Sequence, residues 1–277
     1  MLRAQTLVLT MIAMIAFAAN SLLCRYALSH SDTDPASFTS IRILSGAVIL
    51  WLITRLRTPQ HGMQGNWRSA FALFGYAAAF SFAYVSLPAA TGALLLFGSV
   101  QATMIGYGLM HGERLRGVRL IGFLAALAGL VALLLPGVSA PPLPGSVLMV
   151  GSGIAWAVYS LRGKGATDPT AVTAGNFCRA ACFAVGLSII MLPWSSIDLA
   201  GLAYAVLSGA FASGIGYVIW YMALSGLNSV EAATVQLSVP VIAGAGGVLI
   251  LAEPLSLRLV LCAATVLSGV ALVIIRK

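Results

Sequence analysis

Long apolar stretches separated by short polar connections run through the whole sequence. Each stretch is close to the roughly 20 residues that an α-helix needs to cross a bilayer. The pattern predicts an all-α integral membrane protein with ten transmembrane helices, five in each half of the chain. They are expected near residues 6–28, 36–54, 67–87, 89–110, 117–136, 144–161, 172–193, 200–223, 230–251 and 256–275.

The two halves of the chain share short motifs. Glu113-Arg114-Leu115 and Glu253-Pro254-Leu255 follow the fourth predicted helix of each half, and the two glutamates are 140 residues apart in a chain of 277. Thr33-Asp34-Pro35 and Thr167-Asp168-Pro169 precede the second helix of each half. A repeat at half the chain length indicates two units, 1–138 and 139–277. Because five is odd, the second unit enters the membrane from the opposite side, which gives the inverted repeat found in many secondary transporters.

The basic residues are distributed unevenly between the two ends of these helices. With a cytoplasmic N-terminus, eleven Lys and Arg residues lie on the cytoplasmic side and only Arg25 and Arg258 on the other. This asymmetry follows the positive-inside rule and predicts that both termini are cytoplasmic. Glu113 and Glu253 close helices at the end that disfavours an acid. We therefore expect a nearby arginine such as Arg114, Arg116 or Arg258 to hold each of them in place; a role in gating is the alternative.

The composition agrees with a membrane protein, since 60% of the residues are hydrophobic and 8% are charged, against about 25% charged residues in soluble domains. No room remains for a sizeable soluble domain. The short basic connections suggest a bacterial inner membrane. They also explain the net charge of +8 as an orientation signal, so no nucleic-acid partner is expected. Cys24, Cys178, Cys182 and Cys262 all lie in apolar stretches without metal-ligand spacing, which predicts buried packing.

These features resemble the EamA family of the drug/metabolite transporter superfamily over essentially the whole chain. The residues that carry the resemblance are the paired Asp-Pro and Glu-x-Leu motifs within two five-helix halves. The resemblance implies export or exchange of small metabolites, commonly amino acids, through a central cavity. It also implies that the first, third, fourth, sixth, eighth and ninth helices line that cavity. In one departure, the family's proline in the fourth helix of each half is present as Pro240, but Phe97–Gln101 has none.

Polar residues near the middle of an apolar helix are costly in lipid and tend to face a cavity or a partner helix. Aromatic residues at helical spacing in the third and sixth helices add candidate walls, although such residues also pack between helices, and serines also bond to backbone carbonyls. The predicted substrate-binding residues are Asn20, Tyr76, Phe80, Tyr84, Ser99, Gln101, Trp156, Tyr159, Trp220 and Gln236; Ser81, Asn176, Ser213, Tyr217, Tyr221 and Ser238 fit the same pattern.

Three charged residues and one proline add further candidates. Arg42 and Arg179 lie about seven and eight residues into their helices, where each either snorkels to the interface, holds a substrate carboxylate, or pairs with Glu231. Glu231 opens the ninth helix, where it either favours the helix terminus or is the one membrane-embedded acid available for proton coupling. Pro240 deprives the Gln236 carbonyl of its usual partner near the bilayer midplane, which predicts a kink or a hinge.

The inferred cavity wall of amides, hydroxyls and rings favours a zwitterion with an apolar side chain over a phosphorylated sugar, which needs several cations. The histidines His30, His61 and His111 lie in connections or at helix ends, so no enzyme activity, metal or cofactor is expected. We therefore expect a monomeric exporter of amino acids with broad specificity, including aromatic ones, that works by alternating access. Its partners are the substrate and membrane lipids. The alternatives are an efflux transporter for multiple drugs or quaternary ammonium compounds, and a structural or assembly protein.

Overall fold

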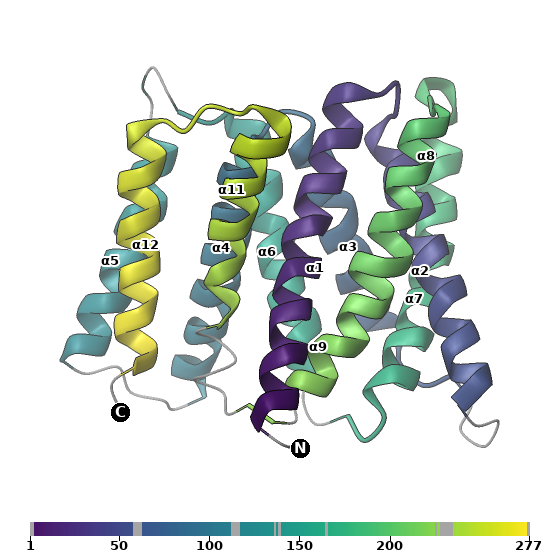
Figure 1. Ribbon diagram of the computed structural model, residues 1–277, viewed down its shortest axis with the longest axis horizontal. Helices are drawn as coiled ribbons and strands as arrows, with labels where there is room; N and C mark the ends of the chain where they lie inside the picture. The colour runs from purple at the N-terminus through teal and green to yellow at the C-terminus, as the bar shows by residue number, and fades with distance from the viewer. Residues whose placement is uncertain are drawn as a thin grey trace.

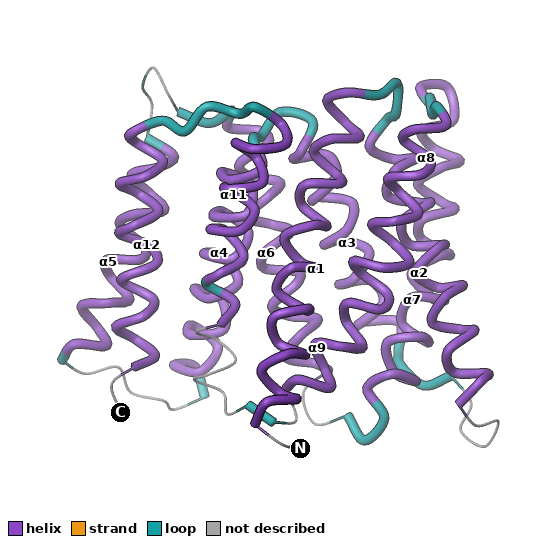
Figure 2. The backbone as a smooth tube through the Cα atoms, viewed as in Figure 1, coloured by secondary structure: helices purple, strands orange, loops and turns teal. Residues whose placement is uncertain are grey.

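The computed structural model describes residues 3–57, 63–111, 117–135, 137, 140–163, 166–224, 226–227 and 235–275. Within those ranges the chain is helical, with short connections and no strand. The helices stand side by side, and both termini lie at the same end of the bundle (Figures 1 and 2). That arrangement is the one expected of an even number of crossings.

The helix bounds agree closely with the predicted ranges except at the ninth helix, which is predicted from residue 230 but begins at Ser238; residues 228–234 lie outside the described part of the chain. The first half contains α1 (Arg3–His30), α2 (Pro35–Arg57), α3 (Trp67–Tyr84), α4 (Ala89–Met110) and α5 (Val118–Leu134). The second half contains α6 (Leu143–Gly163), α7 (Pro169–Met191), the 3-10 turn η1 (Leu192–Trp194), the run of α8 (Leu199–Val206), η2 (Leu207–Ile215) and α9 (Gly216–Leu224), then α11 (Ser238–Leu251) and α12 (Leu257–Ile275). With α8, η2 and α9 counted as one continuous helix, the described residues form ten long helices.

The bundle has an apolar exterior and a partly polar interior. Leu249 is 83% exposed and Ile189 is 67% exposed, whereas Asn20 and Arg42 are buried. Soluble proteins show the opposite arrangement for charged groups. Six helical segments are long and apolar enough to cross a membrane: α1, α2, α4, α6, α7 and the α8–η2–α9 run. A multi-pass membrane protein is therefore confirmed, while ten crossings remain a prediction, because α5, α11 and α12 are apolar but shorter and α3 falls in neither group.

The Asp-Pro motifs begin the helices that they were predicted to begin. Asp34 Oδ1 accepts hydrogen bonds from the backbone N–H groups of Ala36 and Ser37, both at 2.9 Å, at the start of α2. Asp168 caps α7 in the same way, through the N–H of Ala171 at 3.0 Å. Partial burial by itself raises the pKa of Asp34, but the hydrogen bonds from Ser37, Ser196 and Ala36 outweigh it and hold the pKa below its ordinary value of 3.8.

Glu253 is held by an arginine, but not by the one predicted. Its Oε1 lies 2.8 Å from Arg25 Nε of α1, and its Oε2 accepts the Ala89 N–H of α4 at 2.7 Å. Arg258 donates instead to the carbonyls of Ala132 and Leu135, which attaches α12 to the end of α5. The expected pairing of Glu253 with Arg258 is therefore wrong, because helix packing brings α1 closer to Glu253 than the arginine next in sequence. Glu113, Arg114 and Arg116 lie outside the described residues.

The middle of the α8–η2–α9 run is a π-helix, whereas the sequence predicts a regular helix there. The π-helical segment η2 has nine residues and contacts α1 and α2. A π-helix closes its hydrogen bonds over five residues and is frequent at functional sites. Here Gly209 lets the backbone approach α2 so closely that a Cβ would overlap the Arg42 carbonyl oxygen.

Candidate functional site

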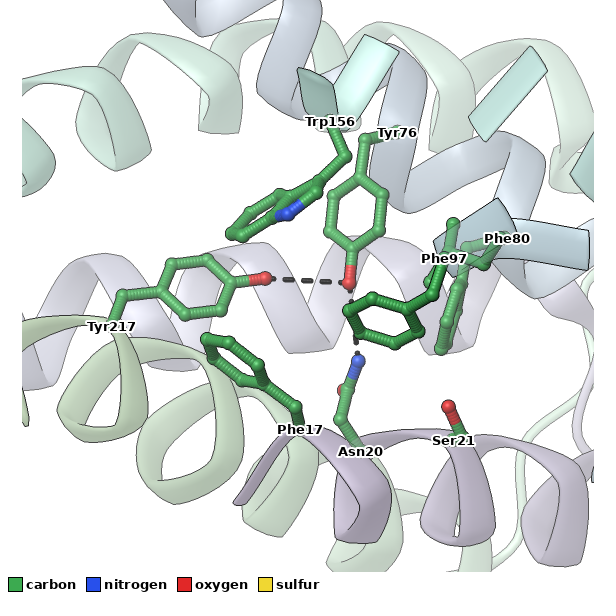
Figure 3. Close-up of a pocket in the computed structure, with 9 residues that line it drawn as sticks. Phe17, Asn20, Ser21, Tyr76, Phe80, Phe97, Trp156 and Tyr217 are labelled. Atoms are coloured by element: carbon green, nitrogen blue, oxygen red, sulfur yellow. Dashed lines mark hydrogen bonds between the residues drawn. The ribbon is translucent and has the colours of Figure 1, made fainter. Parts of the chain in front are cut away.

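A pocket lies where α1, α3, α4, α6 and α9 meet, near the middle of these helices (Figure 3). The rings leave so little open space in the pocket that about one water molecule has room to move. The lining residues are Phe17, Asn20, Ser21, Tyr76, Phe80, Leu96, Phe97, Trp156 and Tyr217.

Helical spacing accounts for the way in which single helices contribute several wall residues. On α1, Asn20 lies three residues and Ser21 four residues after Phe17. On α3, Phe80 lies four residues after Tyr76. Residues three or four apart share one face of a helix. Asn66 caps the start of α3 by accepting the Ser69 N–H at 2.9 Å. This cap fixes the N-terminus of the helix that carries both rings.

Aromatic rings form most of the wall. The Trp156 ring centroid lies 4.9 Å from that of Tyr76 and 4.8 Å from that of Tyr217, and Phe17 closes the group at 6.1 Å from Trp156. These separations lie within the range of favourable ring contacts. Four helices thus meet through rings, and the pocket has flat apolar surfaces on several sides.

The Tyr76 hydroxyl is the centre of the polar part of the pocket. It accepts hydrogen bonds from Arg42 Nη2 at 2.9 Å, from Asn20 Nδ2 at 3.3 Å and from the Tyr217 hydroxyl at 3.4 Å. Asn20 Oδ1 in turn accepts the Ser208 hydroxyl of η2 at 2.6 Å. The network joins α1, α2, α3 and the π-helical segment behind the rings.

Arg42 lies inside the bundle and does not snorkel to the interface. Its side chain is 2% exposed, and its Nε donates to the Ser213 hydroxyl at 3.1 Å. The guanidinium carbon is 5.1 Å from the Tyr76 ring centroid and 4.8 Å from that of Phe80, at the distance of cation–π contacts. Its Nη1 has no hydrogen-bond partner, and neither does the buried Ser21 hydroxyl. No Asp or Glu of the described ranges forms an ion pair with Arg42.

The structure brings some of the predicted substrate-binding residues to the pocket and others only near it. Asn20, Tyr76, Phe80 and Trp156 line it. Three more pack against wall residues: Tyr84 lies 4.7 Å from Phe80, Tyr159 lies 5.6 Å from Trp156, and Trp220 lies 5.8 Å from Phe17, measured between ring centroids. Ser99 and Gln101 of α4, and Gln236 ahead of α11, are buried but do not line it.

The remaining candidates lie elsewhere. Arg179 Nη1 donates to the carbonyls of Gln64 at 3.0 Å and Gly175 at 2.8 Å, which holds the connection before α3 against α7. Glu231 lies outside the described residues. Pro240 is the third residue of α11, and a turn at Leu237 interrupts the helical backbone just before that helix begins.

The predicted substrate-binding set does not include Phe17, Ser21, Leu96, Phe97, Tyr217 and Ser208. Phe17 could have been found from Asn20, since it lies three residues before it on the same helix, and Ser21 lies four residues after Phe17. Leu96 and Phe97 offer no such signal, because the apolar residues of α4 are spread over all of its faces. Among the described residues, His, Cys, Asp and Glu form no group of three that could hold a metal.

Comparisons with known proteins agree with this architecture. A protein of Pseudomonas aeruginosa, described as uncharacterised, is 56% identical over 98% of this chain and 94% of its own length. An uncharacterised transporter of Archaeoglobus fulgidus is 25% identical over 86% of each chain, and one of Clostridium kluyveri is 24% identical over 82% of this chain and 79% of its own. A solved crystal structure, described only as that of a protein, has a TM-score of 0.71 at 20% identity and covers 99% of this chain and 98% of that one, which shows a shared fold.

The second half of the chain provides the family assignment. Residues 143–275 match the model of the EamA-like transporter family. The relatives described as transporters extend the likeness over most of the first half as well. Residues 143–275 are therefore similar to the EamA-like transporter family, and the likeness to proteins described as transporters covers most of the chain.

Proposed function

We propose that this transporter exports small metabolites across the bacterial inner membrane, most readily amino acids with aromatic or large apolar side chains. Both termini face the cytoplasm in this proposal, as the distribution of basic residues favours. The observation that carries it is the pocket itself, where rings of four helices surround a hydroxyl and amide network. The rings suit an apolar side chain, and the hydrogen-bonding groups suit the polar end of an amino acid.

The constriction of the pocket supports alternating access. A space with room for about one freely moving water molecule is too small for an amino acid. The wall helices must therefore separate before a substrate enters, first toward one side of the membrane and then toward the other. The pocket is built within one chain, which supports a working monomer.

Two inverted units, 1–138 and 139–277, provide a way for the helices to move. The helix contacts support this arrangement, because α2 contacts α7, α4 contacts α11, and α5 contacts α12. In the first unit α3 contacts α6, the first helix of the second unit. Correspondingly, the α8–η2–α9 run of the second unit contacts α1, the first helix of the first unit. In transporters of this kind one unit rocks against the other around a fixed central site.

Efflux of quaternary ammonium drugs is the second candidate, because aromatic rings attract such cations. The buried Arg42 guanidinium beside Tyr76 and Phe80 opposes this function. A cation in the pocket would meet a like charge in surroundings of low dielectric constant. The amino-acid function therefore fits the charge of the pocket better.

The test is exchange in liposomes that contain the purified protein, with labelled phenylalanine or leucine inside and a panel of unlabelled solutes outside, with and without a pH gradient. We expect exchange with amino acids, and a fall of about tenfold in Trp156→Ala, since the lost ring contacts amount to roughly 1.4 kcal/mol. The matched control is Trp67→Ala, because Trp67 is exposed at the start of α3. Movement of ammonium drugs without amino acids would favour efflux, and equal losses in both variants would remove the pocket from the pathway.

A further inference from the structure

The direction of the hydrogen bonds at Tyr76 determines what its hydroxyl offers to the pocket. Arginine has no acceptor atom, so Arg42 Nη2 must be the donor in its 2.9 Å bond to the Tyr76 oxygen. The Asn20 amide is oriented by Ser208, because 2.6 Å is the length of an O–H···O bond and is short for N–H···O. Asn20 Nδ2 therefore faces Tyr76 and donates as well.

A tyrosine hydroxyl accepts through two lone pairs and donates one proton. Arg42, Asn20 and, more weakly, the Tyr217 hydroxyl at 3.4 Å all donate to the Tyr76 oxygen. The proton of Tyr76 therefore remains to be donated. The pocket is thus lined by a donor that a buried cation polarises.

Arg42 supplies a charge that has no ionic partner among the described residues. Its Nη1 and the Ser21 hydroxyl are the two buried side-chain polar atoms of the described residues that have no hydrogen-bond partner. The guanidinium lies against the rings of two wall residues, Tyr76 and Phe80. An unpaired buried cation is strongly unfavourable, and a carboxylate is the group that best matches a guanidinium in charge and shape.

The described part of the chain offers the pocket no acid. Its carboxylates lie at helix ends or in connections, and none lines the pocket; they belong to Asp32, Asp34, Asp168, Asp198 and Glu253. The site therefore combines a cation and O–H donors with flat apolar walls. Such a site recognises the carboxylate of a substrate, and its described residues offer nothing of opposite charge to the ammonium group.

Building on the proposed transport function, we propose that the substrate is held by its carboxylate, at the Tyr76 and Ser21 hydroxyls beside Arg42. Its aromatic or apolar part lies against Phe17, Trp156 and Tyr217. The amino group contributes little, so the substrate class extends from amino acids to small monocarboxylates with an aromatic or large apolar tail. The geometry thus assigns a specificity for net anionic or zwitterionic ligands over cationic ones.

Four compounds that share one phenyl ring separate the contribution of the carboxylate to binding from that of the amino group. They are 3-phenylpropanoate, phenylalanine, 3-phenylpropanamide and phenethylamine. Binding is measured as the rise in thermal unfolding temperature of the purified protein, and transport as exchange against labelled phenylalanine in liposomes. We expect 3-phenylpropanoate to bind within a few-fold of phenylalanine, and the amide and the amine to bind at least about tenfold more weakly, since charge-assisted bonds are roughly twice as strong as neutral ones.

Variants test the assigned atoms. Tyr76→Phe removes only the hydroxyl, and we expect it to weaken 3-phenylpropanoate by about tenfold while leaving 3-phenylpropanamide nearly unchanged. Arg42→Lys keeps the charge without the planar fork and should retain part of the preference for the carboxylate, whereas Arg42→Gln should abolish it. If an Arg42 variant does not fold, as judged by size-exclusion chromatography, Tyr76→Phe decides the question alone.

The two proposals fail in different ways. If the amide or the amine binds as well as the carboxylate, or if Tyr76→Phe weakens all four compounds equally, the carboxylate assignment is overturned even when amino acids are exchanged. If carboxylates bind selectively but neither they nor amino acids are exchanged, the assignment stands and the proposed transport function is overturned.

Discussion

Arg25 and Glu253 form an ion pair of 2.8 Å across 228 positions of sequence, between α1 and the connection that follows α11. The same carboxylate accepts the Ala89 N–H at the start of α4, and Arg25 Nη1 donates to the carbonyls of Tyr84 and Val85. Four segments are therefore joined at one end of the bundle by two side chains. Their exposed fractions are 19% and 12%, so water weakens this pair only in part.

We expect Arg25→Gln and Glu253→Gln each to lower the free energy of unfolding by about 1.5–3 kcal/mol, since each change removes a charged hydrogen-bond partner from a partly buried site. The double variant should lose less than the sum of the single losses, because the two residues act on each other. Thermal unfolding of the purified protein in detergent gives all three values. Strictly additive losses would contradict a direct contribution of the pair.

Gly209 allows the π-helical segment to touch α2. Gly209→Ala should cost about 1–3 kcal/mol of stability and reduce transport, because the added methyl group overlaps the Arg42 carbonyl and neither backbone can yield easily. The matched control is Gly151→Ala on α6, where a Cβ meets nothing within 4 Å. Unfolding temperatures should fall for the first variant and stay level or rise for the second. An unchanged Gly209→Ala protein would show that the contact is not needed.

Asp34 should make stability depend on pH in the acid range. Its pKa is lowered in the folded protein, so its contribution is complete above the ordinary value of 3.8 and is lost as the pH falls below it. Asp34→Asn should therefore be less stable than the parent protein at pH 7, and the difference should shrink below about pH 4. The control Asp32→Asn changes an exposed neighbour. A constant difference between parent and Asp34→Asn at all pH values would contradict the assignment.

Pro240 should affect motion more than stability. It lies in the first turn of α11, after the interruption at Leu237, where a proline is tolerated. Pro240→Ala supplies an N–H that can donate to the Gln236 carbonyl and extend the helix. We expect turnover several-fold slower, with an unfolding temperature close to that of the parent protein. Pro193→Ala, in the exposed turn η1, is the control. Equal turnover in the parent and Pro240→Ala would exclude a hinge at this proline.

The sequence predicts helix positions well because the signals are local. α4 begins and ends at the predicted residues, and α2 and α7 begin at Pro35 and Pro169, directly after their capping aspartates. It predicts the partners of charged residues poorly. Arg258 is close to Glu253 in sequence, yet Arg25 binds it, because the contact depends on how α1 packs against α11.

By itself, the sequence determines that this chain forms a bundle of membrane helices, and it indicates a polar centre through Asn20, Tyr76 and Trp156. Only the tertiary structure decides which faces point inward, because the lipid-facing side of a membrane helix is as apolar as its packed side. α2 and α4 carry apolar residues on every face, so periodicity gives no inward direction. For that reason the packing of the helices, and not their order along the chain, buries Arg42 and makes Tyr76 a hydrogen-bond donor. The same packing brings the π-helical segment into the Arg42 network.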